Sequence, residues 1–108
     1  MASTLAPGEL FTLDSLVTST AQGIASRVLA RTAAGNITLF AFDAGEELAE
    51  HTAPFDALVL TLSGNFVLTI GGREVQTTPQ SVVLMPANVP HAVQATEPSR
   101  MLLLMLRD

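Results

Sequence analysis

The chain has 108 residues and no cysteine, and 48% of its residues are hydrophobic while 14% are charged. This length suits one domain with a single core, and the lack of cysteine excludes disulfides, thiolate metal sites and cysteine nucleophiles. A formal net charge of −5, with scattered arginines and no lysine, predicts that the protein binds no nucleic acid.

The first 23 residues form a segment that we interpret as an N-terminal arm. Its apolar residues Phe11, Leu13, Leu16 and Val17 are spaced like one amphipathic turn or an arm that docks on the rest of the domain. The chain contains no apolar run of the roughly 18 residues that a membrane span needs, and its start lacks the pattern of a signal peptide. We therefore expect a cytoplasmic protein with no membrane partner.

Residues 24–108 read as one all-β barrel domain. Short apolar runs alternate with turn signals such as Gly-Asn and Gly-Gly, at the spacing expected of a sandwich or barrel. The predicted strands are 24–31, 36–43, 57–63, 66–71, 73–77, 81–86, 91–95 and 100–107.

Two of these runs, 36–43 and 100–107, are apolar on both faces. A half-buried antiparallel strand would alternate between apolar and polar residues, so the second face of these strands must also be covered. A helix, the arm or a second subunit could cover it. We favour the second subunit and predict a homodimer joined sheet to sheet.

The two histidines each lie within a recognisable phrase. Gly45, His51 and Gly64 follow the spacing of a glycine, five residues, a histidine and a later glycine, and Pro86 precedes His91 by five residues. Together these phrases resemble the two motifs of the cupin superfamily, in particular its small single-domain bacterial members. The resemblance covers about residues 23–108 and implies an antiparallel double-stranded β-helix, a jelly-roll barrel, with the histidine-bearing strands side by side.

Half of the residues that bind metal in the family pattern are replaced in this chain. Ala53 stands at the second histidine position and Ala57 at the glutamate position, while Gln80 and Asn88 occupy two glycine positions of the second motif. A catalytic metal site normally has about three protein ligands, so the remaining pair predicts weak binding at most.

A third ligand has two candidates in the sequence. Asp56 lies one residue before the glutamate position, and Gln94 follows His91 by three residues. Side chains alternate faces along a strand, so Asp56 would point away from the barrel unless a β-bulge re-aimed it. The candidate cofactor is one divalent ion, Ni, Zn, Cu, Fe or Mn, held by His51 and His91 with Asp56 as the weaker candidate.

The function favoured by these features is binding of a small organic molecule inside the barrel. His51 and His91 would be its polar contacts, with Gln94 nearby and Phe55 capping the mouth of the pocket. One alternative is a metal-dependent enzyme, an isomerase, lyase or oxygenase that acts on a small organic substrate. Another is a non-catalytic dimeric module with a sealed core. We interpret the acidic residues Glu46, Glu47 and Glu50 as a solvated loop.

Overall fold

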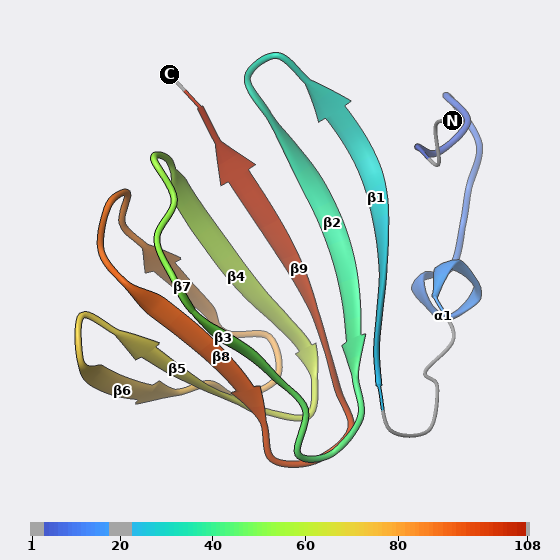
Figure 1. Cartoon of the computed structure of the whole chain (residues 1–108). Coiled ribbons are helices and arrows are strands. Elements are labelled where there is room, and N and C mark those ends of the chain that lie inside the picture. The colour runs from blue at the N-terminus through green and yellow to red at the C-terminus, as the bar shows by residue number, and fades with distance from the viewer. Residues whose placement is uncertain (1–3, 18–22, 108) are drawn as a thin grey trace.

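The computed structural model describes residues 4–17 and 23–107. A single helical turn, α1 (Leu13–Leu16), precedes a series of β-strands in this part of the chain (Figure 1). The strands are β1 (Ile24–Thr32), β2 (Gly35–Phe42), β3 (Glu47–His51), β4 (Asp56–Ser63), β5 (Phe66–Ile70), β6 (Arg73–Gln76), β7 (Val82–Met85), β8 (His91–Ala95) and β9 (Ser99–Leu106).

The strands form two antiparallel sheets that face each other. The five-stranded sheet has the order β1-β2-β9-β4-β7, and the four-stranded sheet has the order β3-β8-β5-β6. Neighbouring strands are often far apart in the sequence, because each sheet takes strands from both halves of the chain. The predicted all-β jelly-roll barrel is therefore confirmed, as a double-stranded β-helix.

The main core lies between the two sheets. Alternate residues of each strand point inward, as the two-residue period of a strand requires. Phe42, Val59, Phe66, Leu68 and Met101 contribute to this core and are at most 1% exposed. We call the side of each sheet that bears these residues its barrel-facing side.

The outer side of the five-stranded sheet carries a second apolar cluster. Leu39 and Ala41 of β2 are buried there against Leu29 of β1 and against Leu16 and Val17 of the arm. The predicted second apolar face of strand 36–43 is thus present, and the arm covers part of it. In the arm, Phe11 and Leu13 remain 36% and 39% exposed.

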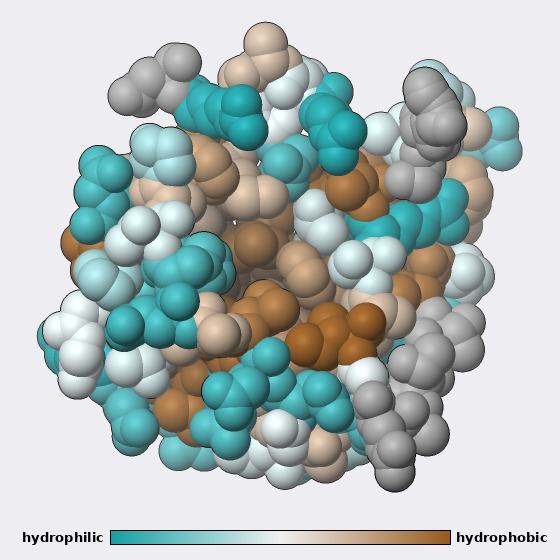
Figure 2. Space-filling view, in the orientation of Figure 1, coloured by the Kyte–Doolittle hydropathy of each residue, from teal (hydrophilic) through white to brown (hydrophobic). Residues whose placement is uncertain are grey.

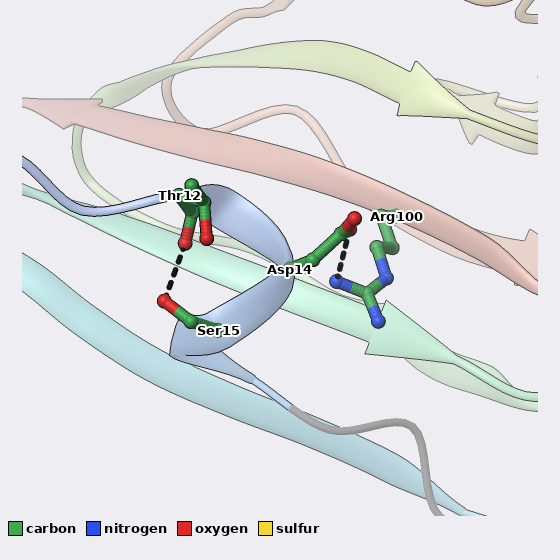
Figure 3. A network of polar contacts seen from close by, with 4 residues as sticks. All are labelled: Thr12, Asp14, Ser15 and Arg100. Atoms are coloured by element: carbon green, nitrogen blue, oxygen red, sulfur yellow. Dashed lines mark hydrogen bonds and ion pairs between the residues drawn. The ribbon is translucent and has the colours of Figure 1, made fainter.

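Polar contacts hold the arm against the sheet (Figure 3). Arg100 of β9 forms an ion pair with Asp14 of α1 at 3.3 Å, and the Ser15 hydroxyl donates to the Thr12 carbonyl at 2.8 Å. The Leu5 amide also donates to the carbonyl of Leu29, a residue of the edge strand β1, at 2.9 Å. The contacts of Asp14 and Leu5 link the arm to the sheet, and Leu16 and Val17 of the arm belong to the outer cluster.

The two ends of the barrel differ in their loops. One end contains the turns at 33–34, 52–55, 71–72 and 86–90, and we call it the histidine end because β3 finishes and β8 starts there. The other end contains the turns at 43–46, 64–65, 77–81 and 96–98, and we call it the closed end. In Figure 1 the two sheets diverge toward the histidine end, from the β1–β2 turn at the top of the view to the β5–β6 turn at its left.

The acidic segment before His51 corrects one sequence interpretation. Glu47 and Glu50 are exposed, but they lie in strand β3 and not in a loop. The strand forms because its backbone pairs with β8, where Glu47 faces Gln94 and Leu48 faces Val93. An edge strand needs one hydrogen-bonding neighbour and one apolar face, and Leu48 is enough to supply that face.

Among the described residues, no helix is long and apolar enough to cross a membrane.

Candidate functional site

His91 opens strand β8 at the histidine end. His91, Val93 and Ala95 alternate along the strand on its barrel-facing side, and the His91 side chain is 5% exposed. The residue before it, Pro90, accepts a hydrogen bond from the Gly71 amide at 2.8 Å, which ties the start of β8 to the β5–β6 turn. His91 Nδ1 lies 3.2 Å from the Val89 carbonyl oxygen. The imidazole is therefore buried and fixed on one side by the backbone.

His51 ends strand β3 directly opposite His91. The register of the two strands shifts between Leu48 and His51, and this irregularity brings His51 into line with His91. His51 is exposed, and its Nδ1 lies 3.0 Å from the Ala49 carbonyl oxygen. The two rings are 4.3 Å apart between centroids at an interplanar angle of 69°. The Nε2 atoms are 3.1 Å apart.

The hydrogen bonds of the two rings define which nitrogens are available. A carbonyl oxygen only accepts, so each Nδ1 carries the hydrogen that it donates to Ala49 or Val89. Each neutral ring then has an unprotonated Nε2, and these two lone pairs face each other. The two Nε2 atoms lie within hydrogen-bonding distance, and a proton or a cation between them would link the rings. The predicted pairing of His51 and His91 is thus present, with both Nε2 atoms directed to one point.

Asp56 does not join the histidine pair. It is opposite Leu106 in the β4–β9 register, while the next residue, Ala57, is opposite Met105 of the core. The register shift between these strands lies at Thr61–Ser63, far from Asp56, so no bulge re-aims its side chain. Its Oδ1 accepts a hydrogen bond from the Ala87 amide at 2.8 Å. Asp56 therefore braces the turn before His91 from the other side of the sheet.

Gln94 and Phe55 also lie apart from the two rings. Gln94 is exposed and alternates with the buried His91, Val93 and Ala95, so it occupies the outer side of β8. The Phe55 ring is half-buried and stacks with the Arg107 guanidinium, which lies 5.4 Å from the ring centroid. Their roles as ligand contacts stay predictions, and of the two only Phe55 lies in a turn of the histidine end.

Comparison with known proteins agrees with this arrangement. A family model described as the cupin domain matches residues 38–107, a span that includes both histidines. The chain belongs to the cupin family.

Solved structures of similar cupins and related proteins cover almost the whole chain. A conserved protein of unknown function from Streptococcus pyogenes is 31% identical, with a TM-score of 0.89 over 96% of this chain and 91% of that chain. A cupin superfamily protein from Desulfitobacterium hafniense is 30% identical, with a TM-score of 0.87 over 96% of this chain and 95% of that one. A cupin 2 conserved barrel domain protein from Leptotrichia buccalis is 34% identical, with a TM-score of 0.85 over 90% of this chain and 47% of that one. No curated protein matched the chain.

The cupin barrel of this chain retains the backbone of its second motif despite the replaced glycines. Gln80 has a φ of 63° and Asn88 a φ of 64°, both in the left-handed region that favours glycine. The Asn88 amide donates to the Ala53 carbonyl at 2.8 Å and links the turns at 52–55 and 86–90. The turn at 86–90 before His91 therefore keeps the conformation that a motif glycine would give, and so does the turn at 77–81 at the closed end.

The histidine pair of this cupin offers two nitrogen atoms to which one metal ion could bind. Within residues 4–17 and 23–107, no group of three or more His, Cys, Asp or Glu side chains could hold a metal ion. Two nitrogens bound to one ion at about 2.0–2.1 Å stand about 2.9 Å apart at a right angle and about 3.4 Å apart at the tetrahedral angle. The observed 3.1 Å between the Nε2 atoms lies between these limits. The pair fits two positions on one ion, and the other ligands would have to come from water or a bound molecule.

Two polar residues on the barrel-facing side, Asn36 and Thr38, were not predicted from the sequence motifs. Both belong to β2, at positions that alternate with the outward-facing Ile37 and Leu39. The Thr38 hydroxyl donates to Asn36 Oδ1 at 3.1 Å. The two-residue period of the apolar run 36–43 carried this signal, because it places both residues on the same side as Phe42.

Proposed function

We propose that this cupin binds a small organic molecule at the histidine end, with His51 and His91 as its polar contacts and one divalent metal ion between them. The observation that carries the proposal is the 3.1 Å separation of two Nε2 atoms whose partner nitrogens are already engaged by carbonyl groups. A divalent ion bound there would act as a Lewis acid toward an oxygen atom of the ligand. His51 and His91 would hold the ion, and their Nδ1 hydrogen bonds would orient the rings.

The surroundings of the pair support an organic ligand. The described barrel-facing residues are mainly aliphatic or aromatic, and Ala53 and Ala57 are small apolar residues where larger polar residues stand in the family pattern. Figure 2 shows a hollow near the centre of this face of the molecule, lined largely by apolar residues. Apolar walls with a few convergent polar groups are typical of small-molecule sites.

Metal titration of the full chain tests this proposal. Wild-type protein should bind about one equivalent of Ni²⁺ or Zn²⁺ in calorimetry, and His51→Ala should lower the affinity at least tenfold because it removes one of two ligands. His51 is exposed, so its removal should leave the fold intact. Glu97→Gln is the control, since it removes an exposed carboxylate at the closed end. Equal metal affinity in wild type and His51→Ala would refute the metal site.

We further propose a homodimer joined through the outer side of the five-stranded sheet. Val82, Leu84 and Leu106 lie on this side and are 59%, 51% and 51% exposed. They continue the apolar surface that the arm covers over β2. An apolar groove of about 220 Å³ lies at the ends of β1, β2 and β9, beside the turn at 33–34. Sedimentation equilibrium should show a dimer that Leu84→Glu dissociates, whereas Leu10→Glu, on the arm and 89% exposed, should not.

A further inference from the structure

A group of hydrogen-bond donors lies on the five-stranded sheet, at the same end of the barrel as the histidine pair. Asn36 and Thr38 are opposite Met105 and Leu103 of β9, which pack against the main core, so both polar residues belong to the barrel-facing side. Arg31 of β1 is directly opposite Asn36. Residues opposite each other in an antiparallel pair share a face of the sheet, which places Arg31 on that side too. We call Arg31, Asn36 and Thr38 the donor wall.

Two groups of the donor wall, the Arg31 guanidinium and the Asn36 amide N–H groups, have no acceptor among the described residues. Thr38 is 6% exposed and donates to Asn36 Oδ1, so the oxygen of that amide is occupied and its two N–H groups remain. Arg31 is exposed and forms no ion pair or hydrogen bond through its guanidinium within the described residues. The barrel-facing positions described for the five-stranded sheet include no Asp or Glu. This wall therefore presents a positive charge and free N–H donors at the histidine end.

A carboxylate is the ligand group that matches such a wall. It accepts several hydrogen bonds at once and pairs with a guanidinium in a bidentate geometry. The other barrel-facing residues near the wall, such as Met105 and Leu103, are apolar and suit a short carbon chain. The histidines belong to the four-stranded sheet and the donor wall to the five-stranded sheet, so a molecule that contacts both must carry polar groups at two separate positions.

We propose that the histidine end takes a small hydroxy or keto acid, whose carboxylate is held by Arg31 and Asn36 while its hydroxyl or carbonyl oxygen faces His51 and His91. This assignment rests on the proposed function and specifies its ligand class. Thr38 is a positioning residue, because its hydroxyl fixes the Asn36 amide with the N–H groups available to the ligand.

Paired probes test the proposal on the full chain loaded with Ni²⁺. The probes are 4-oxopentanoate and 4-hydroxybutanoate, each compared with its methyl ester by calorimetry. Wild-type protein should bind each acid at least tenfold more tightly than its ester, because the ester has lost the negative charge. Equal binding of acid and ester, or no measurable binding of either acid, would overturn the proposal.

Two variants test whether the donor wall causes the preference for the acid over its methyl ester. Asn36→Asp keeps the volume and the acceptor for Thr38 but replaces the N–H donors with negative charge, and Arg31→Gln removes the guanidinium. Each should reduce acid binding at least tenfold and leave ester binding unchanged. Arg100→Gln, which removes an arginine on the outer side of the sheet, should keep the preference for the acid. Unchanged acid binding in both donor-wall variants would also overturn the proposal.

Metal binding separates this proposal from the proposed function. Asn36→Asp and Arg31→Gln should bind Ni²⁺ as wild type does, since neither residue contacts the imidazoles in the structure. If His51→Ala retains full metal binding while the donor-wall variants lose the acid, the histidine site fails and the carboxylate site stands. If the metal depends on His51 but acids and esters bind alike, the histidine site stands and the carboxylate site fails.

Discussion

The closed end and the histidine end of this barrel are built from the same strands but packed in different ways. At the closed end, the rings of Phe42 and Phe66 meet edge to face at 5.1 Å between centroids, and both residues are at most 1% exposed. At the histidine end, the exposed His51 and the buried His91 meet in a similar edge-to-face geometry at 4.3 Å. A ring pair thus occupies each end, and only the second pair carries nitrogen atoms and reaches solvent.

Polar groups also differ between the two ends. The closed end buries the Thr61 hydroxyl, which donates to the Thr77 hydroxyl oxygen at 2.9 Å, and the same oxygen accepts from the Phe66 amide at 2.9 Å. These bonds satisfy their groups within the protein. At the histidine end, the two Nε2 atoms face each other, and the Asn36 amide nitrogen has no acceptor among the described residues. The closed end therefore satisfies its buried polar groups within the protein, whereas the histidine end carries the polar groups of the proposed site.

The largest effect expected from this comparison is at Phe66. Phe66→Ala should lower the free energy of unfolding by about 3–5 kcal/mol, because it removes a fully buried ring and leaves a cavity. Urea denaturation of the purified variant measures this loss. Phe55→Ala, which removes a half-buried ring at the histidine end, should cost less than half as much. Equal losses of unfolding free energy in Phe66→Ala and Phe55→Ala would contradict the expectation that the closed end contributes more to stability.

A smaller effect is expected at Asp56, which braces the histidine end. Asp56→Ala should lower the free energy of unfolding by about 1 kcal/mol, because it removes the acceptor for the Ala87 amide in an exposed setting. It should also weaken Ni²⁺ binding, since the turn that leads to His91 loses a contact. Denaturation and metal titration measure the two effects. Asp56→Asn keeps an acceptor oxygen and should recover most of both, and failure to do so would point to a role for the charge itself.

The smallest expected effect concerns the two residues with positive φ, one near each end. Gln80→Gly at the closed end should raise the free energy of unfolding by about 0.5–1 kcal/mol, because a left-handed conformation is strained for a residue with a Cβ. Asn88→Gly at the histidine end should change stability less, because asparagine tolerates this conformation. The midpoints of chemical denaturation measure both. A loss of stability in Gln80→Gly would show that its side chain makes a contribution larger than the strain.

Most of the fold followed from the two-residue period and the turn residues. The eight predicted runs match observed strands to within one residue at each end. Strand β3 was missed because three acids in five residues resemble a solvated loop, and pairing through the backbone leaves little trace in side-chain polarity. The outer face of β2 was predicted to be covered, but the choice between arm and subunit depends on contacts with Leu16 and Val17 that composition does not specify.

The candidate site was predictable in part. The motif spacing brought His51 and His91 together, and the alternation rule anticipated that Asp56 would point away from them. The hydrogen bond of Asp56 to the Ala87 amide joins positions 31 residues apart in the sequence, so only the folded chain reveals it. The same holds for the Nδ1 hydrogen bonds, because they depend on the local path of the backbone at Ala49 and Val89.

The position of β3 at the margin of its sheet has a consequence for how molecules of this protein meet one another. A strand at the border of a sheet presents unpaired backbone groups along which another chain could add a strand. Glu47 and Glu50 are exposed on this strand, in a chain whose mean hydropathy is +0.42 and whose net charge is −5. A second negatively charged molecule approaching along this border would be repelled. We therefore expect the carboxylates beside His51 to oppose aggregation through this open strand.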